Sequence, residues 1–429
     1  MRVAIVHPSL DVKGGAENVV VWLAEELVRR GHAVTVFTSA YDEGYYGPRA
    51  GHQFRIITLD LGGYDIDPAK FIVAGWRLRN SLTGFDWVNP HNFPAYHWVH
   101  WARRFNPQIG PVVWFCEEPV RHFYPEVCNS HLLQLECRKP ASPSRSRPLP
   151  FAARLRARLG QQKLSVARAM DLRVVPRLDR ILANSEFIAS QVRTIFRVPV
   201  QACLLGAPPA GRTSRTGRRS TLNAEPYLLT VSRLYPEKNI GAVLEAIKFL
   251  KTQGTLPFAR YVVAGEGPLK NALAQRARDL GIADSVELLG FVSDDDLADL
   301  YQYAALVIYV PLDETYGLVF PEAAFWRKAV IGPDHGGPAE IIRHGETGLQ
   351  VDATDPRAIA DAIAMCMRDP ELRARLGNAA YEYATAELTF SHFVDRFERC
   401  LRTPNPVGQS GQTQEPRTQR TVNSAADRG

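Results

Sequence analysis

Apolar residues in the first forty positions form two short runs, separated by a glycine-containing loop and a helix-like stretch. Residues 3–7 predict a buried strand, and residues 18–30 place apolar side chains at helical spacing. Gly31 then ends the helix, and residues 32–38 predict a second strand. Strand, loop, helix and strand in this order predict a βαβ unit, and therefore a parallel sheet with helices on its faces.

The same alternation continues along most of the chain. Further strands are predicted at residues 54–59, 87–89, 112–116 and 180–185. A second series begins at residue 227, with strands at 227–231, 260–264, 286–289, 305–310 and 329–332. Helices are predicted between them at 240–251, 269–280, 294–304 and 321–327, and a long helical stretch at 356–401. The pattern predicts two doubly wound α/β domains that face each other across a cleft, where such folds place ligands.

Composition sets the expected boundaries. Residues 206–226 contain Gly, Pro, Ser, Thr and Arg with almost nothing to bury, which is typical of a linker. We therefore expect one domain over residues 1–205 and a second over 227–384, followed by a last helix over 385–402. Residues 403–429 are polar and without helix caps, so we expect a disordered tail there.

Charge and cysteine content exclude some classes of protein. Hydrophobic residues make up 45% of the 429 residues and charged residues 22%, which argues against a disordered chain. The net charge of +6 permits an anionic partner without naming one. The six cysteines show no C-x-x-C spacing, which favours reduced thiols in a cytoplasmic protein. No stretch reaches the ~18 uncharged apolar residues that span a bilayer, so any membrane contact is expected at the surface.

The segment 313–323, DETYGLVFPEA, carries two carboxylates eight residues apart. Glu314 lies in a loop and Glu322 near a helix start at Pro321, with free backbone N–H groups expected from Gly317 to Phe320. N–H groups at a helix start favour an anion or a sugar oxygen, and a carboxylate can accept two hydrogen bonds from a vicinal diol. Each glutamate alone is better explained as a solvated acid at a helix start, because acids favour first turns.

The segment 232–240, SRLYPEKNI, follows a predicted strand end. A turn at Pro236 can direct Arg233 and Lys238 into one cleft, where they would hold a diphosphate. Two solvated surface cations are the alternative. The loop Lys13–Gly14–Gly15–Ala16–Glu17 permits close backbone approach to a phosphate, but a plain tight turn explains it as well.

Together these segments resemble glycosyltransferase family 4, the retaining enzymes of the GT-B fold. The resemblance covers residues 1 to 400 and rests on several motifs in the family's order. They are K-G-G-A-E at 13–17, N-S at 184–185, S-R-L-x-P-E-K-N at 232–239, G-E-G-P at 265–268, L-G-F-V at 289–292, E-x7-E at 314–322, G-G-P-A-E at 336–340 and G-x-T-G at 345–348.

The resemblance implies a role for each matching residue. Arg233 and Lys238 would hold the diphosphate of a sugar nucleotide, Glu322 the ribose hydroxyls, and Glu314 the transferred sugar. The backbone around Gly317, Leu318 and Val319 would support sugar and phosphates, Phe291 and Val292 would contact the base, and Gly15 would lie near the diphosphate. The first domain would hold the acceptor, and the last helix would cross back onto it.

The segment 112–126, VVWFCEEPVRHFYPE, departs from the family pattern. Related chains often carry a histidine there that faces the donor sugar, whereas this chain has Glu117, with Glu118 next and His122 close by. Glu117 could accept a hydrogen bond from a sugar hydroxyl, or be a loop acid without that role.

Two D-x-D patterns, Asp65 to Asp67 and Asp294 to Asp296, raise the question of a metal ion. The second follows Ser293 and matches an N-cap with an acidic first turn. Because Arg233 and Lys238 already offer charge neutralisation, we expect no metal and no cofactor besides the sugar nucleotide as co-substrate.

Residues 138–180 contain twelve Lys and Arg and two Asp. They could lie on anionic lipid headgroups or form a solvated helix face. The stretch has Phe151 as its single aromatic residue and so lacks platforms on which bases could stack, and we expect no nucleic-acid partner.

The sequence thus predicts a metal-independent retaining enzyme that moves a hexose, mannose or glucose, from a GDP or UDP donor to a hydroxyl acceptor. A lipid-linked or cell-surface glycan is favoured as acceptor because of the basic stretch. We expect a cytoplasmic protein, with attachment to the inner face of the membrane as an option. The alternatives are a non-catalytic scaffold of the same fold, a sugar-nucleotide epimerase or a phosphorylase.

Overall fold

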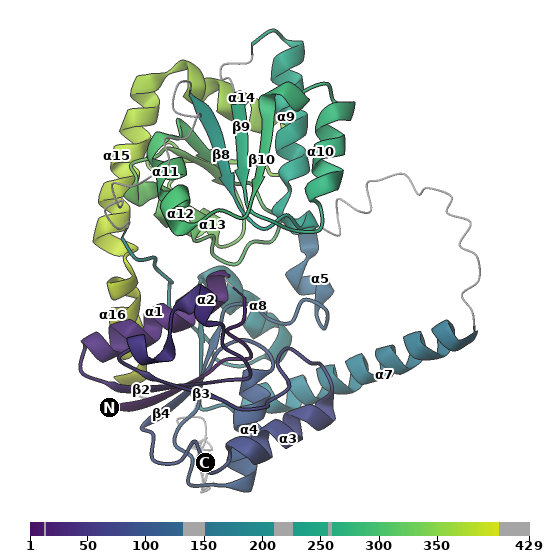
Figure 1. The fold of residues 1–429 in the computed structure, drawn as a ribbon, viewed down its shortest axis with the longest axis vertical. Helices are drawn as coiled ribbons and strands as arrows, with labels where there is room; N and C mark the ends of the chain where they lie inside the picture. Colours follow the sequence, from purple (N-terminus) through teal and green to yellow (C-terminus); the bar gives the residue numbers. More distant parts are fainter. Residues whose placement is uncertain (13, 132–150, 210–225, 256–259, 403–429) are drawn as a thin grey trace, which may run out of the picture.

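The structure is a computed structural model that describes residues 1–12, 14–131, 151–209, 226–255 and 260–402. Lys13, residues 138–150 of the basic stretch, most of the expected linker and the expected disordered tail lie outside the described residues. Figure 1 shows two α/β bodies stacked along the long axis, with the amino-terminal body below and the carboxyl-terminal body above.

The amino-terminal domain contains seven parallel strands. Four form a sheet in the order β3-β2-β1-β4, three form a sheet in the order β5-β6-β7, and the bridges Val88–Val112 and His91–Phe115 connect the two sheets. The strands are β1 (Arg2–Val6), β2 (Ala33–Thr38), β3 (Arg55–Thr58), β4 (Trp87–Pro90), β5 (Val113–Cys116), β6 (Arg180–Ala183) and β7 (Gln201–Ala202). The order reverses between β1 and β4, which is the point where doubly wound sheets bind ligands.

The helices of this domain cover both faces of the sheet. They are α1 (Gly15–Arg29), α2 (Glu43–Tyr46), α3 (Pro68–Leu78), α4 (Ala95–Phe105), α5 (Pro125–Cys128), α7 (Phe151–Val174) and α8 (Glu186–Phe196). Gly31 has a φ of 84° just beyond α1, as expected for a glycine that follows a helix end. The helices α3, α4 and α8 and the short strand β7 are absent from the sequence-based prediction.

The carboxyl-terminal domain has six parallel strands in the order β10-β9-β8-β11-β12-β13. Its strands are β8 (Tyr227–Val231), β9 (Arg260–Ala264), β10 (Val286–Gly290), β11 (Leu306–Ile308), β12 (Val330–Pro333) and β13 (Leu349–Val351). Its helices are α9 (Ile240–Thr252), α10 (Lys270–Asp279), α11 (Asp294–Tyr303), α12 (Val319–Phe325), α13 (Pro338–Ile341), α14 (Pro356–Arg368) and α15 (Pro370–Glu387). This is the strand order of a dinucleotide-binding fold, with its reversal between β8 and β11. The predicted fold class, two Rossmann-like α/β domains, is confirmed.

The helical stretch predicted over residues 356–401 consists of three helices, α14, α15 and α16 (Phe390–Arg402). The last helix begins at Phe390 rather than at residue 385, which still belongs to α15. Asp369 caps the start of α15 by accepting a hydrogen bond from the Leu372 N–H at 2.8 Å, and Pro370 cannot continue α14 because it lacks an N–H.

The helix α16 leaves the carboxyl-terminal domain and packs on α1 of the other domain (Figure 1). Phe393 lies 5.3 Å from Phe115 between ring centroids, and Phe390 lies 5.6 Å from Trp22. The two chain crossings between the domains are hydrogen-bonded to each other. The Ala207 N–H donates to the Leu388 carbonyl at 2.9 Å, and the Phe390 N–H donates to the Ala207 carbonyl at 2.8 Å.

Candidate active site at the domain boundary

The carboxyl ends of β8 and β11 place the most specific sequence motifs beside each other. Arg233 and Lys238 follow β8, and Glu314 follows β11, so they flank the strand-order reversal of this domain. The turn η4 (Pro236–Lys238) directs Lys238 back toward β11. Because a reversal leaves a crevice at the sheet edge, these side chains lie where an α/β domain binds its ligand.

Lys238 and Glu314 form a buried ion pair. Lys238 Nζ lies 2.8 Å from Glu314 Oε2, and the Tyr309 hydroxyl donates to the same oxygen at 2.5 Å. Burial disfavours both charges, but the mutual attraction and the tyrosine hydrogen bond outweigh it. They raise the pKa of Lys238 above its usual value and lower the pKa of Glu314 to about 2. Both groups are therefore ionised at neutral pH.

Glu322 has a different environment from Glu314. Its Oε2 accepts a hydrogen bond from the Tyr301 hydroxyl at 2.9 Å, and burial raises its pKa to about 7. The Tyr301 hydrogen bond opposes this rise and the charge of Asp294 adds to it. Neither Tyr301 nor Tyr309 appears among the sequence-predicted site residues. Tyr309 follows β11 directly, and its place at a strand end is the signal that could have pointed to it.

The loop between the two glutamates is shaped by Gly317, whose φ is 86°. A Cβ atom there would lie 2.8 Å from the Phe320 ring, so only glycine fits. The helix α12 begins at Val319 rather than at Pro321, and the Phe320 N–H donates to the Gly317 carbonyl at 3.1 Å. The expectation that the Phe320 N–H is free is therefore wrong, because the turn that starts α12 uses it.

The remaining predicted donor-binding residues lie around this crevice. A Cβ atom on Gly15 would lie 3.4 Å from Leu318, so the start of α1 touches the loop from the opposite domain. Arg233 is exposed and lies over the Tyr235 ring at 5.5 Å. Phe291 is 59% exposed just beyond β10, and Val292 is half-buried. The structure thus pairs Lys238 with Glu314 and brings Gly15 against Leu318, whereas Arg233 and Phe291 are open to solvent.

Glu117, the residue in the place of the family histidine, is buried at the end of β5 and 8% exposed. Its Oε1 lies 3.3 Å from Nδ1 of His91, at the end of β4, and His91 Nε2 lies 2.9 Å from Asn89 Oδ1. Burial raises the pKa of Glu117 to about 8 and lowers that of His91 to about 3. His122, the histidine that the sequence places near Glu117, is exposed, whereas His91, distant in sequence, makes the contact.

Both D-x-D segments are engaged in local structure. Asp65 contacts Lys70, and Asp67 caps α3 and pairs with Lys163 at 2.7 Å. Ser293 caps α11, as expected from the sequence, by accepting from the Asp296 N–H at 3.1 Å. Within the described ranges, no three His, Cys, Asp or Glu side chains gather closely enough to hold a metal ion.

Two cations of the basic stretch 138–180 form ion pairs with acids of other elements. Residues 151–174 form α7, in which Lys163 pairs with Asp67 and Arg168 pairs with Glu126 at 2.9 Å. Asp171 is fully buried and accepts hydrogen bonds from Tyr96 and Tyr124. In the part of the chain that the structure describes, no helix has the length and apolar character to cross a bilayer.

Two family models match the chain and together cover most of it. The model described as Glycosyltransferase Family 4 matches residues 13–203, and the model described as Glycosyl transferases group 1 matches residues 216–383. The first falls on the amino-terminal domain and the second on the carboxyl-terminal domain with the Lys238–Glu314 pair.

Curated relatives match part of the chain. A GDP-mannose-dependent alpha-(1-6)-phosphatidylinositol monomannoside mannosyltransferase of Mycobacterium tuberculosis is 29% identical over 261 residues, 57% of this chain and 67% of that protein. A D-inositol 3-phosphate glycosyltransferase of Thermobispora bispora is 30% identical over 257 residues, 55% of this chain and 60% of that protein. The matches thus span about two thirds of each relative's length or less.

Solved structures match nearly the whole chain. Anabaena HepE in complex with UDP and glucose has a TM-score of 0.71 at 16% identity, covering 94% of this chain and 99% of that one. Sucrose-phosphate synthase from Thermosynechococcus elongatus has a TM-score of 0.69 at 20% identity, covering 94% and 98%. At these identities the likeness shows the GT-B fold.

Proposed function

The chain belongs to glycosyltransferase family 4, and on that premise we propose that it is a retaining, metal-independent hexosyltransferase. It would move a hexose from a nucleoside-diphosphate sugar to a hydroxyl acceptor. The observation that carries this proposal is the ion pair of Lys238 and Glu314 at the strand-order reversal of the carboxyl-terminal domain. Their side chains are 15% and 13% exposed. A scaffold protein would bury such charges at a cost in stability without a use for them, so the pair favours an enzyme.

Mannose from GDP-mannose is the favoured donor. The printed name of the Mycobacterium tuberculosis relative, which is 29% identical over 261 residues, specifies GDP-mannose. Glucose from a UDP donor is the second candidate. The acceptor that we propose is a lipid-linked or cell-surface glycan, and the cationic stretch 138–180 would hold the enzyme at the inner face of the membrane.

The geometry suggests an exchange of partners when the donor binds. Lys238 would leave Glu314 for the diphosphate, joined by the exposed Arg233, and Glu314 would then accept a hydrogen bond from the transferred sugar. Glu322 would bind the ribose diol, and Phe291 would offer an exposed ring to the base. Because Lys238 and Arg233 neutralise the departing diphosphate, this arrangement provides the electrostatic stabilisation that a bound divalent cation supplies elsewhere.

The transfer step needs no covalent intermediate on the protein. The bond between the sugar C1 and the leaving phosphate oxygen breaks while the acceptor oxygen bonds to C1 on the same face. The proton of the acceptor hydroxyl goes to an oxygen of the leaving phosphate. Cleft closure holds the two reactants together and keeps water out, which limits hydrolysis of the donor.

A thermal-shift panel with GDP-mannose, UDP-glucose, GDP and UDP tests the donor assignment, with turnover followed as release of the nucleoside diphosphate without an acceptor. A ligand at 100 times its Kd adds about 2.7 kcal/mol of stability. We expect one nucleotide sugar to raise the melting temperature in wild type and much less in Arg233→Ala. If none of the four ligands shifts the melting temperature and no hydrolysis occurs, the transferase proposal fails in favour of a non-catalytic protein.

A further inference from the structure

Tyr309 is a buried tyrosine that directly follows β11, five residues before Glu314, and the transfer step proposed above does not use it. Its backbone N–H donates to the Ile331 carbonyl of β12 at 3.0 Å, so its main chain is still tied to the sheet. The residue is 4% exposed, and Phe320 of α12 packs on its ring with the centroids 5.7 Å apart. The sheet and α12 thus fix the position of the Tyr309 hydroxyl.

The Tyr309 hydroxyl and the Lys238 ammonium hold the same oxygen of Glu314. The hydroxyl donates to Oε2 at 2.5 Å, and Lys238 Nζ lies 2.8 Å from that oxygen. Burial and the charge of Glu314 raise the pKa of Tyr309 above its usual value, so the hydroxyl keeps its proton and acts as the donor. Among the residues that the structure describes, no hydrogen bond ends on Glu314 Oε1. This second oxygen can accept a hydrogen bond from the transferred sugar.

The other charged groups near Glu314 act mainly on its neighbour Asp313. Arg121, from the loop after β5, acts electrostatically on Glu314 but donates its hydrogen bond to the Asp313 carbonyl at 2.9 Å. His131 Nδ1 lies 2.8 Å from the Asp313 carboxylate, and His335, from the loop after β12, stacks on His131 at 3.8 Å between ring centroids. Among the described side chains, the Glu314 carboxylate therefore relies on the two contacts at its Oε2.

These two contacts respond differently to a bound sugar nucleotide. In the proposed function Lys238 leaves Glu314 for the diphosphate, which takes the cation away from a buried carboxylate. The Tyr309 hydroxyl has one hydrogen to donate, and its ring is fixed between the sheet and α12, so its contact with Oε2 does not depend on Lys238. A buried carboxylate without a partner would take up a proton or turn toward water. The contact that opposes this is the one from Tyr309.

We propose that Tyr309 is a positioning residue for the transfer reaction. Its hydroxyl holds Glu314 Oε2 while Lys238 binds the diphosphate, so that Oε1 stays directed at the transferred sugar. The inference rests on the proposed transferase function and adds a residue to its site. Tyr309 acts through Glu314 and does not itself touch the reacting atoms.

Tyr309→Phe tests this role, because it removes the hydroxyl and keeps the ring that packs on Phe320. The full chain would be assayed with GDP-mannose or UDP-glucose for release of the nucleoside diphosphate, between about pH 4 and about pH 8. We expect kcat to fall about tenfold to a hundredfold, because the variant loses a hydrogen bond to a charged group. The donor KM should change less than about twofold, because Lys238 and Arg233 remain.

The pH profile separates positioning from a purely structural role. A hydrogen bond donated to a carboxylate lowers its pKa, so its loss raises the pKa of Glu314. The pH below which kcat declines should therefore rise by about one to two units in Tyr309→Phe. The profile of kcat/KM, which reports the free enzyme, should shift less because Lys238 still pairs with Glu314 there.

Tyr261→Phe is the matched control. Tyr261 is buried in β9 of the same sheet, and its hydroxyl lies 2.9 Å from the Thr230 hydroxyl instead of a carboxylate. This variant loses the same atom from the same domain, so its kcat and its pH profile should match those of wild type. A thermal shift with the sugar nucleotide verifies that each variant is folded and binds the donor.

Several outcomes would overturn the role of Tyr309 and leave the transferase proposal standing. They are wild-type kcat in Tyr309→Phe, a lower kcat with an unshifted pH profile, and the same loss in Tyr261→Phe. A fall of more than about a thousandfold would make the hydroxyl part of the chemistry itself, and loss of cooperative melting would make it a requirement of the fold. Absence of turnover in wild type would instead remove the transferase proposal, and this inference with it.

Discussion

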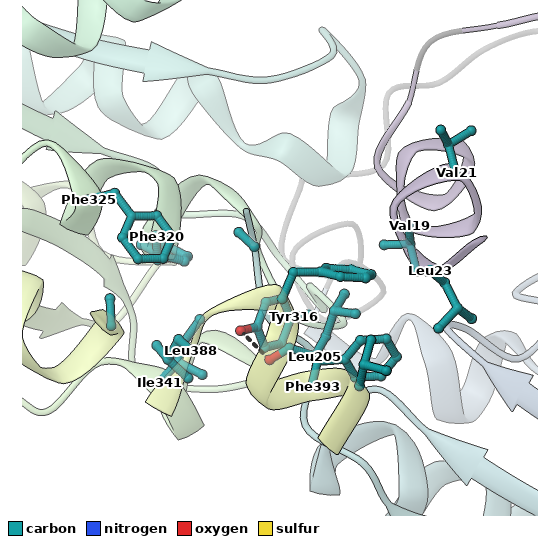
Figure 2. Packing of buried hydrophobic residues seen from close by; sticks show 14 of the residues in the cluster. Val19, Val21, Leu23, Leu205, Tyr316, Phe320, Phe325, Ile341, Leu388 and Phe393 are labelled. Atoms are coloured by element: carbon teal, nitrogen blue, oxygen red, sulfur yellow. Dashed lines mark hydrogen bonds between the residues drawn. The ribbon is translucent and has the colours of Figure 1, made fainter. Parts of the chain in front are cut away.

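His131 Nδ1 lies 2.8 Å from Asp313 Oδ1, and this contact joins the amino-terminal domain to the loop that carries Glu314. Ser185, also in the amino-terminal domain, donates to the Thr315 carbonyl at 2.7 Å. Tyr316 follows and donates to the Leu205 carbonyl at 2.8 Å, as Figure 2 shows. Glu314, in the same loop, instead contacts Lys238 of its own domain. The position of Glu314, the proposed catalytic carboxylate, therefore depends on contacts with both domains.

Breaking this contact should affect catalysis more than donor binding. His131→Ala removes a side-chain partner of Asp313 without touching the Lys238–Glu314 pair, so we expect kcat for transfer to fall about tenfold, equivalent to about 1.4 kcal/mol of transition-state stabilisation. The donor KM should change little. His122→Ala, an exposed histidine of the same segment, is the control. A donor KM that rises as much as kcat falls would mean that the contact shapes the donor site itself.

Lys238→Ala and Arg233→Ala should both lower transfer, by about tenfold to a hundredfold, because each removes a charge-assisted contact with the diphosphate. Their stabilities should differ. Lys238→Ala leaves Glu314 buried without its cation and should lower the melting temperature, whereas Arg233 is exposed and its removal should not. Kinetics and thermal melts of the two variants measure this. Near-wild-type turnover in both would remove the diphosphate assignment.

Glu314→Ala and Glu322→Ala should fail in different kinetic parameters. Glu314 is expected to contact the sugar that develops positive charge, so its loss should mainly lower kcat. Glu322 is expected to bind ribose in the ground state and transition state alike, so its loss should mainly raise the donor KM. Identical profiles for the two variants would contradict these roles.

The pKa of Glu322 gives a pH dependence with a definite sign. Because burial raises the folded-state pKa to about 7, the folded protein holds a proton that the unfolded chain releases above about pH 4.5. The contribution of Glu322 to the free energy of unfolding therefore falls as pH rises from about 4.5 to about 7. The free energy of unfolding of Glu322→Gln minus that of wild type should therefore be larger at pH 8 than at pH 5. A stability difference that is constant across this range would show that Glu322 ionises normally.

EDTA should leave transfer largely unchanged. The motivation is the pair of cations at the proposed diphosphate site, since Asp67 and Ser293 show the two D-x-D segments acting as helix starts. Turnover is measured with and without the chelator. Loss of activity that Mn²⁺ or Mg²⁺ restores would instead make the carboxylates near the donor candidates for ligands.

Vesicle co-sedimentation tests the membrane proposal. Binding should require anionic lipid and weaken with salt, because the Debye length falls from about 10 Å at 0.1 M to about 3 Å at 1 M. Replacement of Arg154, Arg156 and Arg158 by Gln should weaken it, whereas Lys163→Gln, whose cation already pairs with Asp67, should weaken it less. Equal pelleting with neutral vesicles would remove the electrostatic argument for a lipid-linked acceptor.

The sequence predicted most strands of the two domains because their apolar runs are buried on both faces, as in β1 and β9, but the short strands β7 and β13 were not predicted. The prediction did not include the helices α3, α4 and α8. Each of them is amphipathic and comes after a short strand of the amino-terminal domain. At the site, the spacing within each motif predicted the pair Glu314 and Glu322 and the pair Arg233 and Lys238. Tyr301 and His91 were not predicted, because each reaches its partner through the fold: Tyr301 meets Glu322 from α11, and His91 meets Glu117 from the neighbouring strand. Tyr309 was also missed, although it lies at a strand end only five residues before Glu314.

The paired chain crossings at Ala207 and Thr389 restrict how the two domains can move. Two segments joined by hydrogen bonds at one place act as a single pivot, so opening of the cleft is a rotation about that place rather than a separation of the two bodies. Figure 1 shows α15 and α16 along one side of the molecule and α5 on the opposite side. His131 follows α5 in the chain and contacts Asp313 of the other domain. Rotation about the pivot would therefore separate His131 from Asp313 on the side of the molecule away from the crossings.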